Sequence, residues 1–378
     1  MRNGNRLYLR YSLTGFLLLF MQVLPAQIPL PRTLWSGPDT VTVAIAGDIM
    51  LHGKQIEKAS RPDGTFDFSP FLENVEPLIA GADIAIANLE FPLAGPPYQG
   101  YPCFSAPDEY ACYLADKGFD IFLAANNHIL DQGPKGAWRT HRVFEAMKKS
   151  HGIRYAGLGA TEALSVARKG IRIAFVNWTY GTNYTGASGG PVIPTHNRDS
   201  IGRAIREARE RGVDFVIALP HWGIEYTHRH TQAQHDLARF VAAEGADAII
   251  GSHPHVVQDM EILTEPAFNG IGTRKVPVWY SLGNLVSNMS VQGTRIGLIL
   301  LITLVKDRDR LTRYIAGIQP VFTWCTLPGK LTDSYATLPV QSWLGRREEW
   351  KITEDYDNMV RSYKSVKKTT GIQDEENN

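Results

Sequence analysis

The chain has 378 residues, of which 44% are hydrophobic and 20% are charged, and its formal net charge is +1. This composition predicts one large or two ordinary globular domains with a substantial core. The near-neutral charge and the lack of a basic stripe argue against a nucleic-acid partner.

The N-terminal segment has the pattern of an export signal. Three arginines lie within the first ten residues, and an apolar stretch over residues 13–24 follows and ends at Pro25-Ala26. This pattern predicts a secretory signal peptide over residues 1–26, with a linker at 27–40. An uncleaved membrane anchor is the alternative, although the stretch is short for a span of about 20 residues. We therefore expect an exported protein, periplasmic or extracellular, that is associated with the cell envelope.

Four segments then repeat one pattern. A helix-like stretch ends in Gly, an apolar residue and Asp, and a short apolar run leads to polar side chains; the triplets begin at Gly81, Gly118, Gly212 and Gly245. The Gly suits the left-handed position that ends a helix. The apolar run suits a strand that is buried on both faces of a parallel sheet. Open α/β sheets bind ligands beyond the carboxyl ends of such strands.

The predicted strand ends carry metal-binding side chains. A first strand over residues 41–46 leads to Asp48, and the four repeats lead to Glu90, to Asn127 with His128, to His221, and to His253 with His255. Carboxylate, amide and imidazole ligands without thiolate favour Mn, Fe or Zn over a soft metal. The set is larger than one four-coordinate ion needs, which favours two divalent metal ions and an anionic substrate such as a phosphate ester.

Other elements follow from periodicity and turn residues. We expect loops at 95–107, overhanging the site, and at 180–194, a candidate substrate loop. Predicted helices cover 70–80, 107–118, 134–149, 200–211 and 231–244, and further strands cover 171–176, 276–280, 295–304 and 313–324. Residues 326–378 are expected to be a charged C-terminal extension with a disordered end. In an exported chain, Cys103 and Cys112 are expected to form a local disulfide, which leaves Cys325 over.

Taken together, the site motifs resemble those of the CapA family of capsule and poly-γ-glutamate biosynthesis proteins, which are related to calcineurin-like metallophosphoesterases. The resemblance covers about residues 41–290. Its motifs are Gly47-Asp48, Asn88-Leu89-Glu90, Asn126-Asn127-His128 with Asp131, His221-Trp222-Gly223 with Glu225, Gly251-Ser252-His253-Pro254-His255 and Ser281-Leu282-Gly283-Asn284.

The resemblance implies an α/β fold, a four-layer α/β/β/α sandwich of the metallo-dependent phosphatase type, over residues 41–325. It implies two metal ions, with Asp48 and His255 on the first, Asn127, His221 and His253 on the second, and Glu90 bridging them. The implied general acid or phosphate contact is His128, with Asp131 beside it. Further candidate ligands are His52, Asn88, Asn126, Glu225 and Asn284.

The chain departs from the superfamily pattern in three places. His52 lies four residues after Asp48, where the superfamily has a histidine two residues after its aspartate. Glu90 replaces the usual bridging aspartate, and Ile129 replaces an acidic residue. The additional histidines 228, 230 and 235 are expected on the surface or in a loop, with His228 or His230 at the rim.

Two functional hypotheses follow from the resemblance. The first is an exported CapA-like metal-dependent hydrolase that cleaves a phosphoester, or an amide, of an anionic cell-envelope polymer or its precursor, alongside membrane-bound polymer-synthesis proteins. The alternative is a non-catalytic, metal-containing assembly or export component of a capsular polymer machine. An amidohydrolase for γ-glutamyl or peptidoglycan links would use the same metals, and substrate profiling would separate it from the first hypothesis.

Overall fold

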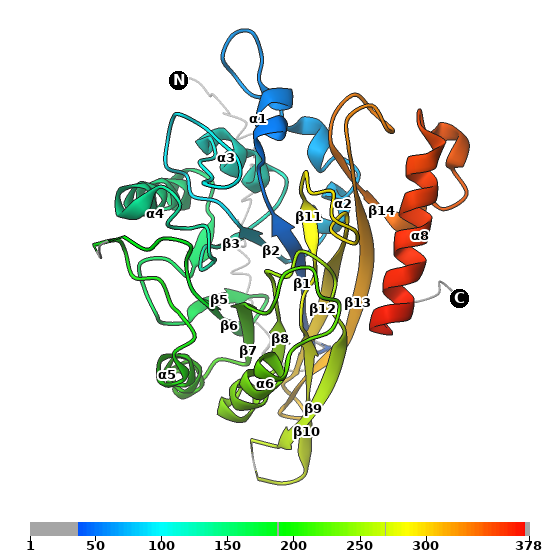
Figure 1. Ribbon diagram of the computed structural model, residues 1–378. Helices are drawn as coiled ribbons and strands as arrows, with labels where there is room; N and C mark the ends of the chain where they lie inside the picture. The colour runs from blue at the N-terminus through cyan, green and yellow to red at the C-terminus, as the bar shows by residue number, and fades with distance from the viewer. Residues whose placement is uncertain (1–36, 187–188, 269, 375–378) are drawn as a thin grey trace, which may run out of the picture. The chain divides into compact units, whose positions relative to one another are not determined.

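The computed structural model describes residues 37–378 except 187–188, 269 and 375–378. The predicted signal peptide, most of the predicted linker and the extreme C-terminus lie outside the described residues. The part that is described is built on two β-sheets (Figure 1). The strand β1 begins at Asp39, so the last two residues of the expected linker already belong to the sheet.

The first sheet has the strand order β14-β13-β12-β1-β2-β3-β4, and β11 pairs with β1 off this path. Neighbouring strands from β1 to β4 are parallel, whereas β12, β13 and β14 are antiparallel. The bounds are β1 (Asp39–Ile49), β2 (Ile84–Leu89), β3 (Ile121–Leu123), β4 (Arg154–Ala156), β11 (Asn284–Val286), β12 (Ile296–Asp307), β13 (Thr312–Thr326) and β14 (Ala336–Pro339).

The second sheet has the order β5-β6-β7-β8-β10-β9. Its centre, from β6 to β10, is parallel, and antiparallel strands close both edges. The bounds are β5 (Leu164–Arg168), β6 (Ile171–Thr179), β7 (Phe215–His221), β8 (Ala248–Ile250), β9 (Met260–Pro266) and β10 (Thr273–Trp279).

Helical segments pack against both sheets, on the outer faces up to residue 244 and beside the core between the sheets from residue 340 onward. They are α1 (Gly53–Ala59), η1 (Ser69–Phe71), α2 (Glu76–Ala80), α3 (Asp108–Asp116), α4 (Gly133–Ser150), α5 (Arg198–Glu210), α6 (Gln232–Glu244), α7 (Val340–Trp343), η2 (Arg347–Glu349) and α8 (Thr353–Thr370). The predicted helix over 70–80 is split into η1 and the short α2. None of the helices in the described ranges is both long and apolar enough to cross a membrane.

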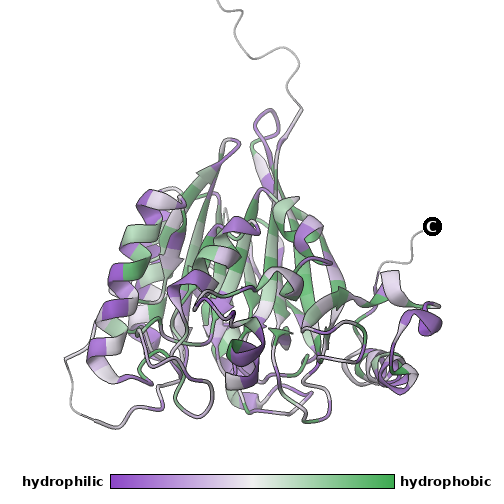
Figure 2. Ribbon diagram, turned by 90° about the horizontal axis from the view of Figure 1, so that it is seen from above, coloured by the Kyte–Doolittle hydropathy of each residue, from purple (hydrophilic) through white to green (hydrophobic). Residues whose placement is uncertain are grey.

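The layers follow from the two-residue period of the strands. In β1, Val43 and Ile45 belong to the core between the sheets, whereas Ala44 and Ala46 pack under α1–α4. The outer face of the second sheet packs against α5 and α6. The sheets are mainly hydrophobic, and the helices carry both hydrophilic and hydrophobic residues (Figure 2). The predicted four-layer α/β/β/α sandwich is therefore confirmed.

Each Gly-X-Asp triplet fixes the strand that follows it to the neighbouring strand. The backbone N–H of each Asp donates to the carbonyl of one residue on the neighbouring strand. The Asp carboxylate accepts from the backbone N–H of that neighbouring residue. The pairs are Asp83 with Thr42, Asp120 with Ala85, Asp214 with Arg172 and Asp247 with Val216. Gly118, Gly212 and Gly245 have positive φ as expected. The prediction was wrong for Gly81, which has φ −76° because α2 ends in the right-handed region.

The C-terminal segment packs on the first sheet. Strand β14 pairs with β13, and Tyr356, Met359 and Tyr363 of α8 belong to the core between the sheets. In Figure 1, α8 runs alongside β12, β13 and β14. Most charged side chains in the described part of this segment are at least partly exposed, whereas Asp355 is buried and pairs with Arg295.

The expected disulfide is absent from the described residues, in which Cys103, Cys112 and Cys325 are all free. The Cys103 carbonyl accepts hydrogen bonds from the Gln99 and Gln132 side chains, which hold its loop against the start of α4. Cys112 lies on α3 and packs against the core under the helices. The prediction of a local bridge was wrong because sequence proximity does not bring these two side chains together.

Candidate metal centre

The predicted ligands meet where the carboxyl ends of both sheets come together. Asp48 at the end of β1 is in register with Asn88 of β2 on one side and with Asn284 of β11 on the other. His221 at the end of β7 pairs with Ser252, which follows β8. Parallel strands thus deliver side chains beyond their carboxyl ends, as the pattern predicts, but they do so from two sheets and not from the edge of one.

Glu90 stands at the centre of this set. Its Oε1 atom lies 3.6 Å from Nε2 of His221 and 3.6 Å from Nε2 of His255. His255 Nδ1 is 3.6 Å from Asp48 Oδ2, and His221 Nε2 is 2.7 Å from Asn127 Oδ1. Potential ligand atoms converge in two overlapping groups, Glu90 with His253 and His255, and Asp48 with Glu90 and His221. The shared Glu90 is where the family resemblance implies a bridging carboxylate.

Several buried polar atoms of the centre have no hydrogen-bond partner within the described part of the chain. They are both carboxylate oxygens of Glu90, Asn88 Oδ1 and His253 Nδ1. Glu90 is fully buried, and leaving a buried carboxylate without a partner is costly. Divalent cations would satisfy the Glu90 oxygens and the His253 nitrogen, so the residues fit a metal centre.

Burial controls the protonation of these groups. It lowers the pKa of His221 well below its usual range, and together with the nearby His255 it lowers the pKa of His253 to about 3. Both rings are therefore neutral at pH 7, as metal ligands must be. Burial alone would lower the pKa of His255, but the Glu90 and Asp48 carboxylates raise it to about 9. Burial also raises the pKa of Glu90 well above its usual range. Bound metal ions would compete with the proton that the raised pKa values leave on the Glu90 and His255 pair.

The loop that carries His253 and His255 is held in an unusual backbone conformation. Both histidines have positive φ, 101° and 59°, which is rare for residues with a side chain. A Cβ atom at Gly251 would lie 2.1 Å from the Tyr280 carbonyl oxygen, so only glycine fits where this loop leaves β8. Backbone strain of this kind is typical of functional sites, where the surroundings enforce it.

His128 lies beside the cluster and is oriented by its neighbours. Its Nδ1 atom is 2.7 Å from Asp131 Oδ2, which also accepts a hydrogen bond from the Phe104 backbone N–H. The rings of Phe104 and His128 meet edge to face with centroids 4.7 Å apart. Phe104 belongs to the loop that was expected to overhang the site. The Nδ1 contact leaves Nε2 of His128 available to a substrate.

The five further candidates occupy different positions. Asn88 Nδ2 donates to Asp48, and Asn284 Oδ1 is 3.1 Å from His255 Nδ1, so both orient the cluster. The amide of Asn126 is hydrogen-bonded at both ends, to the Leu89 carbonyl and to the His128 backbone N–H, so it holds the loop. His52 contacts Gln55 and the Asn288 backbone, and Glu225 is half-buried; neither belongs to a ligand group found in the described residues.

Four neighbours of the centre had no predicted role, although Ser252 and Tyr226 belong to the motifs that carry the family resemblance. The Ser252 hydroxyl is 3.0 Å from His221 Nδ1, and the Asn183 backbone N–H donates to the Asn127 carbonyl. The Tyr180 ring lies 4.6 Å from His253, and the Tyr226 ring lies 6.2 Å from His255. Asn183 and Tyr180 belong to the predicted substrate loop, which was the one signal available. Tyr226 has φ 64°, and no sequence pattern predicted this left-handed backbone conformation.

Comparison with known proteins identifies the family. Residues 42–289, more than half of the chain, match the family described as bacterial capsule synthesis protein PGA_cap. The chain belongs to this family. The matched range contains each member of the buried ligand set.

The PGA_cap chain is also similar to two curated proteins. It is 28% identical over 297 residues to the PGA biosynthesis protein CapA of Bacillus subtilis (strain 168), covering 74% of this chain and 72% of that protein. It is 28% identical over 271 residues to the capsule biosynthesis protein CapA of Bacillus anthracis, covering 66% of this chain and 60% of that protein.

Two solved structures are similar at low identity. A novel phosphatase of Mycoplasma pneumoniae is 12% identical with a TM-score of 0.43, covering 75% of this chain and 94% of that one. The NAD nucleotidase of Haemophilus influenzae is also 12% identical with a TM-score of 0.43, covering 88% of this chain and 61% of that one.

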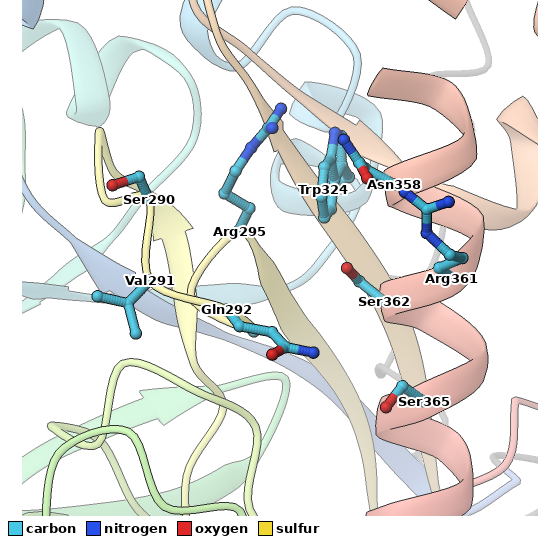
Figure 3. A pocket seen from close by; sticks show the side chains of 10 residues that line it. Ser290, Val291, Gln292, Arg295, Trp324, Asn358, Arg361, Ser362 and Ser365 are labelled. Atoms are coloured by element: carbon cyan, nitrogen blue, oxygen red, sulfur yellow. Dashed lines mark hydrogen bonds between the residues drawn. The ribbon is translucent and has the colours of Figure 1, made fainter. Parts of the chain in front are cut away.

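The PGA_cap chain also has a cavity of about 660 Å³ between the loop after β11, the strand β13 and α8 (Figure 3). None of its lining residues is acidic, and most can donate hydrogen bonds. Asn358, Arg361, Ser362 and Ser365 line it from one face of α8, opposite Ser290, Val291, Gln292 and Gly293, with Arg295 and Trp324 between them. The indole N–H of the buried Trp324 has no partner among the described residues. The loop also bonds to Asn284, because the Thr294 carbonyl accepts from its amide.

Proposed function

We propose that this PGA_cap chain is an exported, metal-dependent hydrolase that acts on an anionic cell-envelope polymer or its precursor. The observation that carries the proposal is the buried Glu90 carboxylate, which has no hydrogen-bond partner in the described structure and faces imidazoles from the other sheet. A purely structural carboxylate at this depth would be hydrogen-bonded.

Six residues would hold the metals, two divalent ions of the Mn, Fe or Zn class. They are Asp48, Glu90, Asn127, His221, His253 and His255. When bound, such ions lower the pKa of water and stabilise negative charge on a substrate oxygen. The oxygen and nitrogen donors, without thiolate, suit these metals.

The protein side chains would supply the proton for the leaving group. His128 is buried at the edge of the cluster, and Asp131 holds its Nδ1 atom, so Nε2 can donate to a phosphoester or amide leaving group. The ring of Phe104 limits rotation of the imidazole. We assign His128 as the general acid and Asp131 as its positioning residue.

The cavity beside α8 supports an anionic substrate. Its lining carries two guanidinium groups and several hydroxyl and amide groups but no carboxylate. Asp355 already pairs with both terminal nitrogens of Arg295, so Arg361, exposed at the rim, is the guanidinium that remains for an anion. Guanidinium groups recognise carboxylates and phosphates through paired N–H donors. The names of the curated relatives, which concern poly-γ-glutamate and capsule biosynthesis, fit the same substrate class.

The direct test is hydrolysis by the metal-loaded protein. Bis-p-nitrophenyl phosphate would report phosphodiesterase activity, and poly-γ-glutamate chain length would report amide cleavage. We expect turnover of at least one, with loss in His128→Ala at unchanged metal content. Bound metal with no turnover of either would favour the assembly or export role instead.

A further inference from the structure

A second set of metal-binding side chains shares no residue with the candidate metal centre at the strand ends, which we call the strand-end centre. His230 precedes α6, His235 lies in the first turns of α6, and Glu261 lies on the edge strand β9. One ligand atom from each can be chosen so that all three atoms lie within 4.8 Å of one another. The three side chains are 27%, 25% and 28% exposed, so an ion could reach them from solvent.

The spacing of the two histidines is fixed by the start of α6. Thr231 is the N-cap: its hydroxyl accepts from the Gln234 backbone N–H at 3.2 Å, and the Gln234 side chain accepts from the Thr231 backbone N–H at 2.9 Å. This reciprocal capping box stabilises the first turn of α6. His230 and His235 flank it, and their rings lie nearly parallel with centroids 5.9 Å apart.

Neighbouring groups hold each candidate ligand. Asp259 Oδ1 accepts from the His230 backbone N–H at 3.0 Å and lies 3.1 Å from Nδ1 of the same residue. The His230 ring stacks on Tyr280 with centroids 4.0 Å apart. The Tyr280 hydroxyl donates to Glu261, whose Oε1 atom lies 2.8 Å from His235 Nδ1. A carboxylate on one ring nitrogen of a histidine is the usual support for a metal on the other.

We infer that His230, His235 and Glu261 form a second cation site, for a single zinc ion. Two imidazoles and one carboxylate are borderline ligands that zinc accepts, and the exposed side leaves a fourth position for water. The ion would replace the direct contact between His235 Nδ1 and Glu261 Oε1. It would join the start of α6 to β9, an edge strand of the second sheet.

Zinc binding to the purified full chain, measured by competition with a chromophoric chelator, tests this inference without an activity assay. The His253→Ala background weakens the strand-end centre and makes the second site easier to count. We expect His235→Ala in that background to bind one zinc ion fewer. The control His151→Ala, which removes a histidine at the end of α4, should bind as many as the background does.

A second variant guards against a folding defect. Glu261→Gln keeps the shape of the side chain, and we expect at least a tenfold weaker zinc affinity with an unchanged circular dichroism spectrum. The inference fails if His235→Ala and Glu261→Gln bind zinc with the stoichiometry and affinity of the background. It also fails if His151→Ala loses zinc to the same extent as His235→Ala.

Discussion

Glu90 and His255 come from different sheets, yet Glu90 Oε1 lies 3.6 Å from His255 Nε2 with both side chains buried. Glu90 follows β2 of the first sheet, and His255 follows β8 of the second. The contact is therefore a direct product of the sandwich, which brings the carboxyl ends of both sheets together. It places an imidazole beside a carboxylate whose two oxygens have no hydrogen-bond partner among the described residues.

Glu90→Gln should largely remove the effect of a chelator on stability. A bound metal stabilises the wild-type fold by mass action, by about 2.7 kcal/mol at a hundredfold excess over the dissociation constant. Thermal melts should therefore show a clear loss for the wild type on addition of EDTA and little change for Glu90→Gln. Glu225→Gln is the matched control and should respond as the wild type does. Equal EDTA sensitivity in Glu90→Gln would contradict a ligand role for this carboxylate.

Removal of the general acid should affect turnover and leave metal binding intact. His128→Ala is expected to lower kcat by about 100-fold or more, the usual contribution of a positioned proton donor. Asp131→Asn should cause a smaller loss and alter the pH profile of kcat, because Asp131 only orients the imidazole. Steady-state kinetics on bis-p-nitrophenyl phosphate measure both. Asp116→Asn changes an exposed side chain on α3 and should leave kcat unchanged. A His128→Ala enzyme with the wild-type kcat would rule out the assignment of His128 as general acid.

The Gly-X-Asp repeat should matter for stability rather than for catalysis. Asp120→Ala removes the acceptor for the Ala85 backbone N–H and is expected to cost about 1–3 kcal/mol in the free energy of unfolding. Denaturant titration measures this cost. Asp309→Ala in the exposed turn between β12 and β13 should change the free energy by less than about 0.5 kcal/mol. Similar values for the two variants would show that the hydrogen bonds of the Gly-X-Asp aspartate do not stabilise the sheet.

The cavity beside α8 should contribute to polymer binding. Reversing the charge at its rim with Arg361→Glu is expected to weaken binding of poly-γ-glutamate at least tenfold without changing metal content. Arg203→Glu makes the same charge change on α5, away from the cavity, and should have little effect. Fluorescence anisotropy with a labelled polymer at fixed ionic strength gives both affinities. An equal loss in the two variants would mean that only net charge matters.

Much of the site could be predicted because a repeated local pattern encodes it. Each Gly-X-Asp triplet marks where a helix ends and a buried strand begins, so the side chains after each strand had to share one edge. Glu90, Asn127 and the three cluster histidines follow from this, and Asp48 follows from the end of the first strand. The triplets alone did not show that these strands belong to two sheets, and the expectation of two sheets came from the family resemblance.

Other features depend on contacts that no short pattern carries. Strand β11 has three residues, yet it delivers Asn284 to His255. Tyr226 reaches the rim through a positive φ that a bulky residue rarely adopts. Helix α8 has a charged composition because its outward side dominates, although Met359 is fully buried. The candidate zinc site joins side chains about 30 positions apart that periodicity does not relate.

The most direct test of the metal centre is metal content by mass spectrometry on the purified chain under metal-replete conditions. The His235→Ala background should be used, since it removes the separate zinc site. We predict about two Mn, Fe or Zn ions per chain in this background, and a clear loss when Glu90→Ala or His253→Ala is added. A chain that binds no metal, or that keeps both ions in these variants, would contradict the centre described above.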